Sequence, residues 1–488
     1  MLPPGGFEFG PFLLDVRTKR LYNDGRIVEM PVRHLAILLA LVSQAGVLIS
    51  KDALIQIGWG DVSTTDNSLA QAINKIRKAL AASNSGPYIE TEPGHGYRFR
   101  AAVTPTAVRG TDAEIEALLG PQRAVRDGRA ALETLRLEGA AAARANYEHL
   151  LLHHGDDPRT HVGLANAYLS RFEATRMDPE PDTAALACAA AHAREGVRLN
   201  LQYPDAWAVL GDVLARTGDP ANALAAFSRA MVLEPHEWMH PLRLGWASWG
   251  RDRLRAAARV LELVPHHPGA HWLLATVFVA RNALAEARRE LDAAVAGLPA
   301  ALAAGGPDPF PTIGVYSLRG FLLMELAARG AGERTVIVGE ALAAFERELA
   351  ACATGHIYAR ETKANAWYGI GSCRLKYGDR DAAGPAFREA LCQVPAHPMA
   401  TAGLAILDSA YRPALAALPD SVDGSAARAA LLVSDDDVPG AVRLVADALA
   451  TAPPGRVGWT IPIDPLLGVH RHPDLWAGVL AQLRARAA

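Results

Sequence analysis

Residues 66–80 have the sequence DNSLAQAINKIRKAL, and this stretch decides how the front of the chain folds. Four apolar side chains recur in it at the spacing i, i+4, i+7, i+11: Leu69, Ile73, Ile76 and Leu80. Such a stripe predicts an amphipathic helix that buries one face in a core. Asp66 stands where its side chain can accept hydrogen bonds from the first-turn amides of that helix.

The opposite face of this helix carries amide and cationic side chains and, between Asn67 and Leu80, no acidic residue. The side chains expected to point outward are Ser68, Gln71, Ala72, Asn74, Lys75 and Lys78. Amide side chains can pair with adenine, and lysine with guanine, in the major groove of DNA, which admits one helix. Arg77 lies beside the apolar stripe, from where its long side chain could reach a phosphate. Taken alone, this face fits a solvated surface helix as well.

The order of the surrounding elements bears on whether this helix reads DNA or is only a solvated surface helix. Strand-like stretches and a turn signal come first, then two helical stretches: Phe7–Phe9, Arg20–Tyr22, Asn23–Gly25, Ile27–Glu29, Leu35–Val42, and a helix with Leu54, Ile55 and Trp59 that Ser50 would cap. After residue 80, Tyr88–Thr91 and Tyr97–Arg100 flank the sequence Pro93-Gly94-His95-Gly96. Glycines around such a tip predict a β-hairpin.

The motifs SKDAL (50–54), GWG (58–60), DNSL (66–69), INKIRKAL (73–80), IET (89–91) and PGHGYRF (93–99) occur in this order. Together they resemble the winged-helix effector domain of OmpR/PhoB-type response regulators, over about residues 7–102. The resemblance implies a four-stranded N-terminal sheet, a three-helix core whose third helix reads DNA, and a hairpin wing that enters the minor groove. It also implies that the loop 60–65 can touch RNA polymerase.

By the same resemblance, Lys75 takes a base-contacting place and Arg98 is the cation of the wing. The full set of expected DNA-binding residues is Asn67, Ser68, Gln71, Asn74, Lys75, Arg77, Lys78, His95 and Arg98. Two positions depart from the family pattern, since Glu92 replaces an apolar residue and His95 a cation. Fewer phosphate contacts weaken the release of counterions, so one copy should bind DNA weakly and tight binding should need a homodimer on adjacent half-sites.

Beyond residue 103 the chain becomes rich in Ala and Leu, and tetratricopeptide spacing appears. From Trp207, offsets of 3, 4, 7, 16, 20, 23 and 28 give a repeat: Leu210, Gly211, Leu214, Ala223, Phe227, Ala230 and Pro235. The same offsets from Trp367 and, with one residue missing, from Trp272 give further copies, and weaker ones occur at 130–150, 161–168 and 245–268. One such unit cannot bury its own face, so the copies should stack into a solenoid. The segment 464–476 resembles a closing cap.

Aligning the repeats brings four cations to equivalent positions: Arg136, Arg216, Arg281 and Lys376. A column of cations along a concave groove would suit an acidic peptide, a terminal carboxylate or an anionic metabolite. The alternative is that cations at this position only complement the end of each helix dipole.

Composition excludes several classes of protein. The net charge is −3, half of the 488 residues are hydrophobic, and four cysteines show no CxxC spacing. These values argue against disorder, a disulfide framework or a structural zinc site, and the apolar runs are too short for a membrane span. We find no secretion signal, phosphate-binding loop, catalytic constellation or metal site, so no cofactor is expected.

The sequence therefore predicts an α+β winged helix-turn-helix at the N-terminus, followed by an all-α TPR superhelical solenoid. The expected boundaries are 1–103 for the winged helix, 104–122 for a linker, and 123–488 for the solenoid with its cap. We expect a cytoplasmic one-component transcriptional regulator without a receiver domain, whose solenoid senses a ligand or protein partner. The alternative is a TPR scaffold whose winged helix docks proteins.

Overall fold

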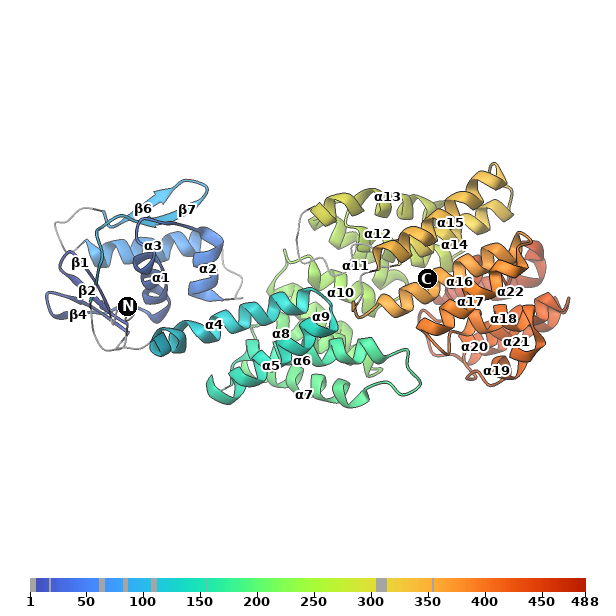
Figure 1. The fold of residues 1–488 in the computed structure, drawn as a ribbon, viewed down its shortest axis with the longest axis horizontal. Helices are drawn as coiled ribbons and strands as arrows, with labels where there is room; N and C mark the ends of the chain where they lie inside the picture. The colour runs from blue at the N-terminus through green and yellow to red at the C-terminus, as the bar shows by residue number, and fades with distance from the viewer. Residues whose placement is uncertain are drawn as a thin grey trace. The chain divides into compact units, whose positions relative to one another are not determined.

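The structure is a computed structural model, and it describes residues 6–16, 19–60, 66–81, 87–106, 112–154, 156–303, 314–352 and 355–488. The chain divides into two compact units (Figure 1). The first comprises Met1–Arg129 with Asn146–Thr160, and the second Ala130–Ala145 with His161–Ala488. We call them the winged-helix unit and the helical unit.

The winged-helix unit begins with an antiparallel sheet of order β4-β3-β2-β1-β8. Its strands are β1 (Gly6–Phe9), β2 (Phe12–Asp15), β3 (Arg20–Asn23), β4 (Arg26–Val28) and β8 (Thr104–Thr106). Four of them match the expected N-terminal sheet. The fifth, β8, comes from residues that we predicted to start the linker, and it pairs with β1 in the register Phe7↔Pro105. An open edge strand offers unpaired backbone groups, and the chain covers that edge with its own next segment.

Three helices and a second sheet complete the winged helix-turn-helix: α1 (Val32–Ser43), α2 (Lys51–Trp59), α3 (Asp66–Leu80), β5 (Leu48–Ser50), β6 (Ile89–Glu92) and β7 (Gly96–Phe99). The predicted cap of α2 is confirmed, because Ser50 Oγ accepts a hydrogen bond from Ala53 N at 3.2 Å. The hairpin turns through Gly94 at φ 82°. The side chain of Asp66, the expected cap of α3, lies outside the described residues.

The core of this unit confirms the apolar stripe of α3. Leu69, Ile73, Ile76 and Leu80 are at most 1% exposed, and they pack with aromatic rings from both sheets. Ala72, which we expected to face outward, is buried as well. Its methyl group sits between two core positions of the stripe, and burial of this small side chain lets α3 approach its neighbours more closely.

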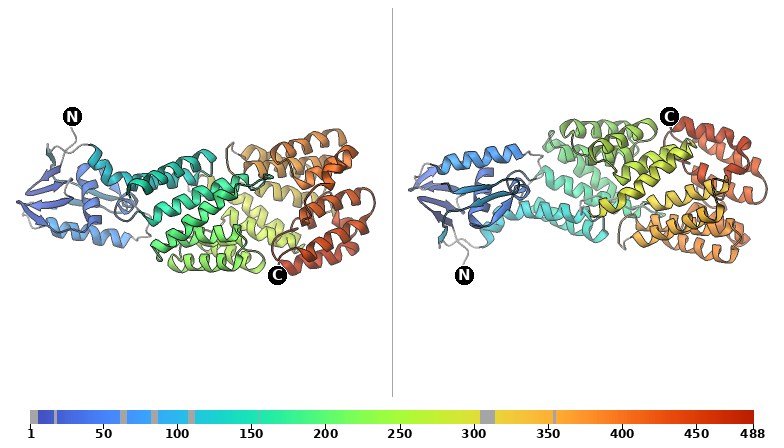
Figure 2. Two further views of the ribbon diagram at one scale, coloured as in Figure 1. Left: turned by 90° about the horizontal axis from the view of Figure 1, so that it is seen from below. Right: turned by 90° about the horizontal axis from the view of Figure 1, so that it is seen from above.

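The rest of the chain is helical: α4 (Asp112–Glu133), α5 (Leu137–His154), α6 (Pro158–Thr175), α7 (Thr183–Leu199), α8 (Pro204–Arg216), α9 (Pro220–Leu233), α10 (Met239–Ala247), α11 (Gly250–Leu263), α12 (Pro268–Ala280), α13 (Leu284–Ala303), α14 (Val315–Ala328), α15 (Arg334–Ala351), α16 (Ala359–Lys376), α17 (Arg380–Gln393), α18 (Pro398–Leu407), α19 (Arg412–Ala416), α20 (Val422–Ser434), α21 (Val438–Thr451) and α22 (Pro473–Arg486). Short 3₁₀ turns occupy Ser409–Tyr411, Ile461–Ile463 and Val469–Arg471. In the helical unit, successive helices pair and stack as a TPR-type solenoid (Figure 2). None of the described helices combines the length and apolar character that crossing a bilayer requires.

The repeats that begin at Trp207 and Trp367 are each closed by a phenylalanine that packs on a glycine. A Cβ placed on Gly211 would lie 2.9 Å from the ring of Phe227, and one on Gly371 would lie 2.6 Å from Phe387. The α14–α15 pair uses the same contact, between Gly320 and the Phe345 ring. Our repeat search missed this pair because its glycine and phenylalanine are 25 residues apart, against 16 in the other two.

The segment that follows α21 does more than cap the last repeat. Trp476 of α22 is fully buried among α18, α20 and α21, as a cap requires. Ile463, however, packs among residues of α12, α13 and α14, and Ala487 packs against α12. Asp464 also accepts a hydrogen bond from the Tyr368 hydroxyl of α16, at 2.9 Å to Oδ2. The segment therefore joins repeats that are far apart in the sequence.

Candidate nucleic-acid interface

The solvent-facing side of α3 carries most of the predicted DNA-binding residues. Asn67, Gln71, Asn74, Lys75 and Lys78 are exposed there, and Ser68 is half-buried. Residues 67, 71, 74, 75 and 78 recur at helical spacing, so their side chains share one face. This face presents amide and ammonium groups that can donate to base edges and phosphates.

Arg77 lies on α3 but is engaged within the protein. Its Nε and Nη2 donate to the backbone carbonyl of Ile89 on β6, at 3.2 and 3.0 Å, and Nη2 also donates to Thr91 Oγ1 at 2.6 Å. The guanidinium also lies over the ring of Tyr97, 5.9 Å from its centroid. We predicted a phosphate contact for Arg77, whereas the structure uses its donors to hold α3 against the hairpin.

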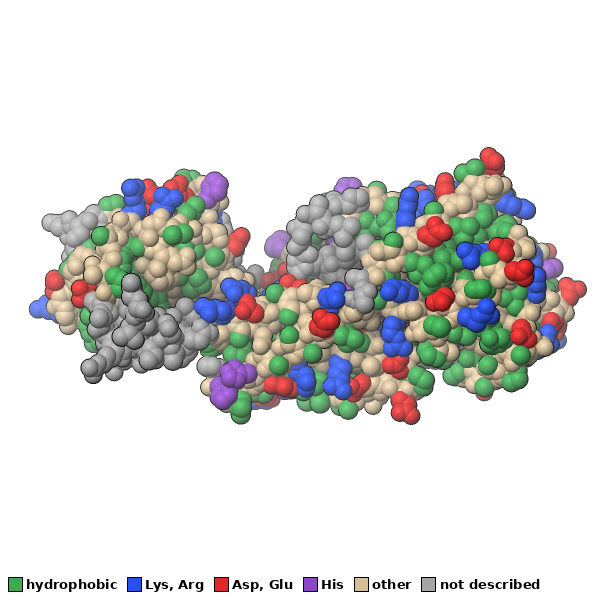
Figure 3. All heavy atoms as spheres, viewed as in Figure 1, with side chains coloured by type: hydrophobic (Ala, Val, Ile, Leu, Met, Phe, Trp, Pro, Cys, Tyr) green, Lys and Arg blue, Asp and Glu red, His purple; other side chains and the backbone are tan. Residues whose placement is uncertain are grey.

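The wing is close to electrically neutral. Arg98 on β7 lies 3.5 Å from a carboxylate oxygen of Glu92 and 4.0 Å from one of Glu90, both on β6. Arg100 pairs with Glu90 at 2.8 Å. Basic, acidic and histidine side chains lie side by side where the hairpin reaches the surface (Figure 3). A phosphate that approaches Arg98 must therefore compete with carboxylates of the wing itself.

The tip of the wing presents His95, which is exposed and donates from Nδ1 to the Pro93 carbonyl at 3.0 Å. Residues 61–65, most of the loop predicted to touch RNA polymerase, lie outside the described residues.

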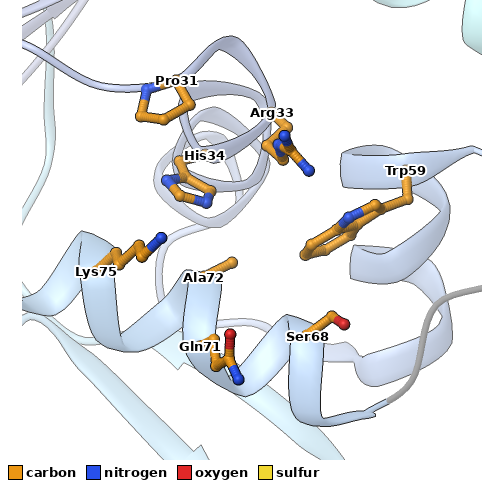
Figure 4. Close-up of a pocket in the computed structure, with 8 residues that line it drawn as sticks. All are labelled: Pro31, Arg33, His34, Trp59, Ser68, Gln71, Ala72 and Lys75. Atoms are coloured by element: carbon orange, nitrogen blue, oxygen red, sulfur yellow. The ribbon is translucent and has the colours of Figure 1, made fainter.

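A pocket of about 240 Å³ adjoins α3 on its α1 side (Figure 4). Its lining combines predicted and unpredicted residues: Pro31, Arg33, His34, Trp59, Ser68, Gln71, Ala72 and Lys75. Sequence reasoning missed Arg33 and His34, because the start of α1 carries no motif of its own, and it placed Trp59 only among the apolar residues of α2. The sequence signal that could have indicated an anion site was Arg33-His34 at the start of a helix whose first turn carries no acidic residue.

The four cations predicted to line a groove of the helical unit are engaged or enclosed. Arg216 Nε donates to Glu173 Oε1 at 2.6 Å, and Arg281 Nε donates to the Ala487 carbonyl at 2.9 Å. Arg136 forms a backbone bridge with His356. Lys376 Nζ is buried, and burial lowers the pKa of this amine. Two of the four predicted cations, Arg216 and Arg281, are therefore bonded within the solenoid, while the Lys376 amine is buried without a hydrogen-bond partner.

One unpredicted cluster brings three potential ligand atoms within 4.8 Å of one another, from Asp205, Glu234 and His240. His240 Nε2 already lies 3.1 Å from Glu234 Oε2 in a hydrogen bond. This contact gives Nε2 a partner, while Nδ1 of the same ring is buried without a hydrogen-bond partner.

Comparison with known proteins places the interface residues in a described family. Residues 25–99 match the family model "Transcriptional regulatory protein, C terminal". The transcriptional regulator HilA of Salmonella typhimurium is 34% identical over 97 residues, which cover 20% of this chain and 17% of that protein. The sensory transduction protein BceR of Bacillus subtilis is 35% identical over 85 residues, covering 17% and 37% respectively. The matched region is thus a minor part of either relative.

Among solved structures, the DNA-binding domain of Escherichia coli CadC is 25% identical, covers 21% of this chain and 98% of that chain, and has a TM-score of 0.20. Yeast Tom70 is 13% identical, covers 78% and 82% respectively, and has a TM-score of 0.39. The family match includes α1, α2, α3 and the whole hairpin wing. Residues 25–99 are therefore similar to the C-terminal domain of transcriptional regulatory proteins, and a helical array with TPR-type pairing follows them in the chain.

Proposed function

We propose that this protein is a sequence-specific DNA-binding transcriptional regulator in which α3 lies in the major groove. The carrying observation is the exposed face of α3, where Gln71, Asn74, Lys75 and Lys78 present donors with no carboxylate among them. Lys75 and Gln71 are the best placed to read bases. The matched family and HilA, a transcriptional regulator by name, support this assignment.

The paired charges of the wing make single-copy binding weak. We therefore infer that two protomers bind adjacent half-sites, about 10 base pairs apart from centre to centre. We also propose that the 60–65 loop touches RNA polymerase. The protein acts without enzymatic chemistry, in the cytoplasm.

The helical unit is proposed to receive the signal, as a ligand or a protein partner. Its repeat architecture supports this role, because stacked helix pairs present extended surfaces that suit partners. The cations Arg136, Arg216, Arg281 and Lys376 add no support, since Arg216 and Arg281 are bonded within the unit and the Lys376 amine is buried.

A specific observation favours a second candidate, a scaffold in which the winged helix docks a protein. Glu90 and Glu92 hold Arg98, the cation that the minor groove would need. The two candidates differ in salt dependence: DNA binding weakens steeply with salt, whereas a scaffold has no salt-dependent affinity for any duplex.

The test is capture of genomic DNA fragments by the full-length protein at two salt concentrations. Enrichment of a tandem or palindromic motif that Lys75→Ala/Arg98→Ala abolishes would support the regulator. The matched control, Arg20→Ala/Arg26→Ala, removes two exposed cations from β3 and β4 and should retain the motif. No enrichment by the wild-type protein at either salt concentration would refute the regulator and leave the scaffold.

A further inference from the structure

The pocket beside α3 contains a buried histidine with no partner for its ring. His34, in the first turn of α1, is 6% exposed and lines the pocket. In the described part of the unit, its imidazole makes no hydrogen bond or ion pair. The ring nitrogens of His34 are not among the described buried polar atoms that lack a partner, so they open into the pocket. The ring is therefore suited to a partner that arrives from outside.

The other groups around the pocket are donors or cations. Arg33 comes from α1, Lys75, Ser68 and Gln71 come from α3, and α2 contributes Trp59, which does not titrate in the ordinary pH range. No carboxylate is among these lining residues. In Figure 4 the His34 ring and the Lys75 ammonium lie close to each other at one end of the pocket. A site of this composition favours an anion.

The backbone adds to this preference. Pro31 precedes α1 and supplies no side-chain cap, and the first turn carries no acidic residue. The amides of His34 and Leu35 donate to the Pro31 carbonyl, at 2.9 and 3.1 Å, and no side-chain oxygen caps the start of α1 or the positive end of its dipole. An oxygen-rich anion in the pocket would supply that acceptor.

The protonation state of His34 depends on whether the anion is present. In the free protein, burial and then the charges of Lys75 and Arg33 lower the pKa of His34 below its usual value. Its ring is then neutral near pH 7. The negatively charged oxygens of a phosphate beside the ring would favour the imidazolium form of His34 and raise that pKa.

We propose that this pocket binds one phosphate of the DNA backbone, and that His34 takes up a proton as the phosphate enters. The source is assigned to DNA because the pocket shares Gln71 and Lys75 with the base-facing side of α3, so a strand that runs along α3 brings a phosphate to its mouth. The inference rests on the proposed DNA binding. Because His34 takes up a proton when the phosphate binds, the affinity for DNA should rise as the pH falls through the neutral range.

The first experiment measures binding of a fluorescein-labelled mixed-sequence duplex of about 30 base pairs, long enough for two half-sites, by full-length protein. Fluorescence anisotropy is recorded between about pH 6 and pH 8, where histidine titrates. The wild-type affinity should rise several-fold per unit of falling pH, and His34→Gln should lose most of this dependence. At about pH 6, the magnitude of the slope of log affinity against log salt concentration should be smaller by about 0.9 in His34→Gln than in the wild-type protein. His236→Gln, an exposed histidine of the helical unit, is the matched control.

The second experiment keeps the native ring, in case His34→Gln disturbs folding. The pKa of His34 is followed by NMR in wild-type protein with ¹³C-labelled histidine, with and without the duplex. A rise in this pKa on DNA binding supports the proposal, and an unchanged value overturns it. A rise caused to the same extent by millimolar sodium phosphate, but not by sodium chloride of equal ionic strength, would assign the pocket to free phosphate and overturn the DNA source.

The two proposals fail in different ways. Wild-type protein that binds no duplex at any pH or salt concentration refutes the proposed function. Wild-type and His34→Gln proteins that bind with equal pH dependence and equal salt slopes refute only the assignment of His34.

Discussion

Arg77 on α3 donates two hydrogen bonds to the backbone carbonyl of Ile89 on β6, at 3.2 and 3.0 Å. The recognition helix and the wing are therefore joined by one side chain. Because hydrogen bonds from a charged donor contribute more than neutral ones, Arg77→Ala should lower the free energy of unfolding of this unit by about 1–2 kcal/mol. Urea unfolding monitored by circular dichroism measures this. Lys78→Ala, on the exposed face of the same helix, should leave the midpoint unchanged.

Glu92→Gln should tighten DNA binding. The substitution removes a carboxylate 3.5 Å from Arg98 and frees the guanidinium for a phosphate. Exposed ion pairs contribute less than about 1 kcal/mol, so the gain should be about two- to fivefold in affinity. It should come with a steeper salt dependence, measured by anisotropy at several salt concentrations. Unchanged DNA affinity and salt dependence in Glu92→Gln would mean that the wing stays away from the duplex.

Gly371→Ala should destabilise the helical unit. The added methyl group would lie 2.6 Å from the Phe387 ring, which is itself fully buried, so the ring or the helix must move. Overpacking of this kind costs about 1–3 kcal/mol. Gly339→Ala is the control, since its Cβ meets nothing within 4 Å in the middle of α15, and alanine there should stabilise by about 0.5–1 kcal/mol. Thermal unfolding of both variants gives opposite shifts if the packing is as described.

His397 should make the helical unit sensitive to acid. Its Nδ1 accepts a hydrogen bond from Ala400 N at the start of α18, and burial lowers the pKa of this ring to about 4. The folded state holds the neutral ring while the unfolded chain takes up a proton, so stability falls as the pH drops from about 6.5 towards 4, by up to about 3 kcal/mol.

His397→Asn keeps a capping oxygen and should flatten this pH dependence in urea unfolding. Two buried carboxyls act in the opposite direction, since burial raises the pKa of Asp464 to about 6 and that of Glu348 to about 7. Their protonation makes folding more favourable at low pH, so the comparison must be between variant and wild type. Equal slopes in the two proteins would contradict the role of His397.

Arg216→Gln should destabilise the fold. The guanidinium holds Glu173, whose side chain is 7% exposed, at 2.6 Å. Removal of one partner leaves a buried carboxylate with less compensation, at a cost of about 2–4 kcal/mol. Arg259→Gln, whose partner Glu262 is exposed, should change stability by less than about 0.5 kcal/mol. If Arg216→Gln leaves the stability unchanged, the structural role of Arg216 is contradicted and its predicted role in a ligand groove is favoured.

Local patterns predicted the elements of the winged helix well. The stripe Leu69 to Leu80 and the cap at Ser50 depend on residues a few positions apart, and both are as expected. The pairing of Thr104–Thr106 with β1 was missed because it joins residues about a hundred positions apart, and no local spacing records such a contact. The same reason explains why Arg77 was assigned to a phosphate: its partner, Ile89, lies beyond the next loop.

The site was predicted in part for a related reason. Side chains on α3 could be placed by helical periodicity, whereas His34 reaches the same surface only through the packing of α1 on α3. In the helical unit, alignment of repeats brought Arg216 and Arg281 to equivalent positions in the sequence. It could not indicate that Glu173 and the Ala487 carbonyl would occupy their donors, because these partners come from other helices.

The segment 456–488 has a consequence for how the array loses its structure. In an ordinary solenoid each repeat touches only its neighbours, and ends can fray while the middle persists. Here Ile463 and Ala487 pack on α12, and His470 lies 2.9 Å from Glu325 of α14, so distant repeats share one strap. Release of that strap exposes several seams at once. The helices it spans should therefore melt together in a single cooperative step rather than peel away one by one.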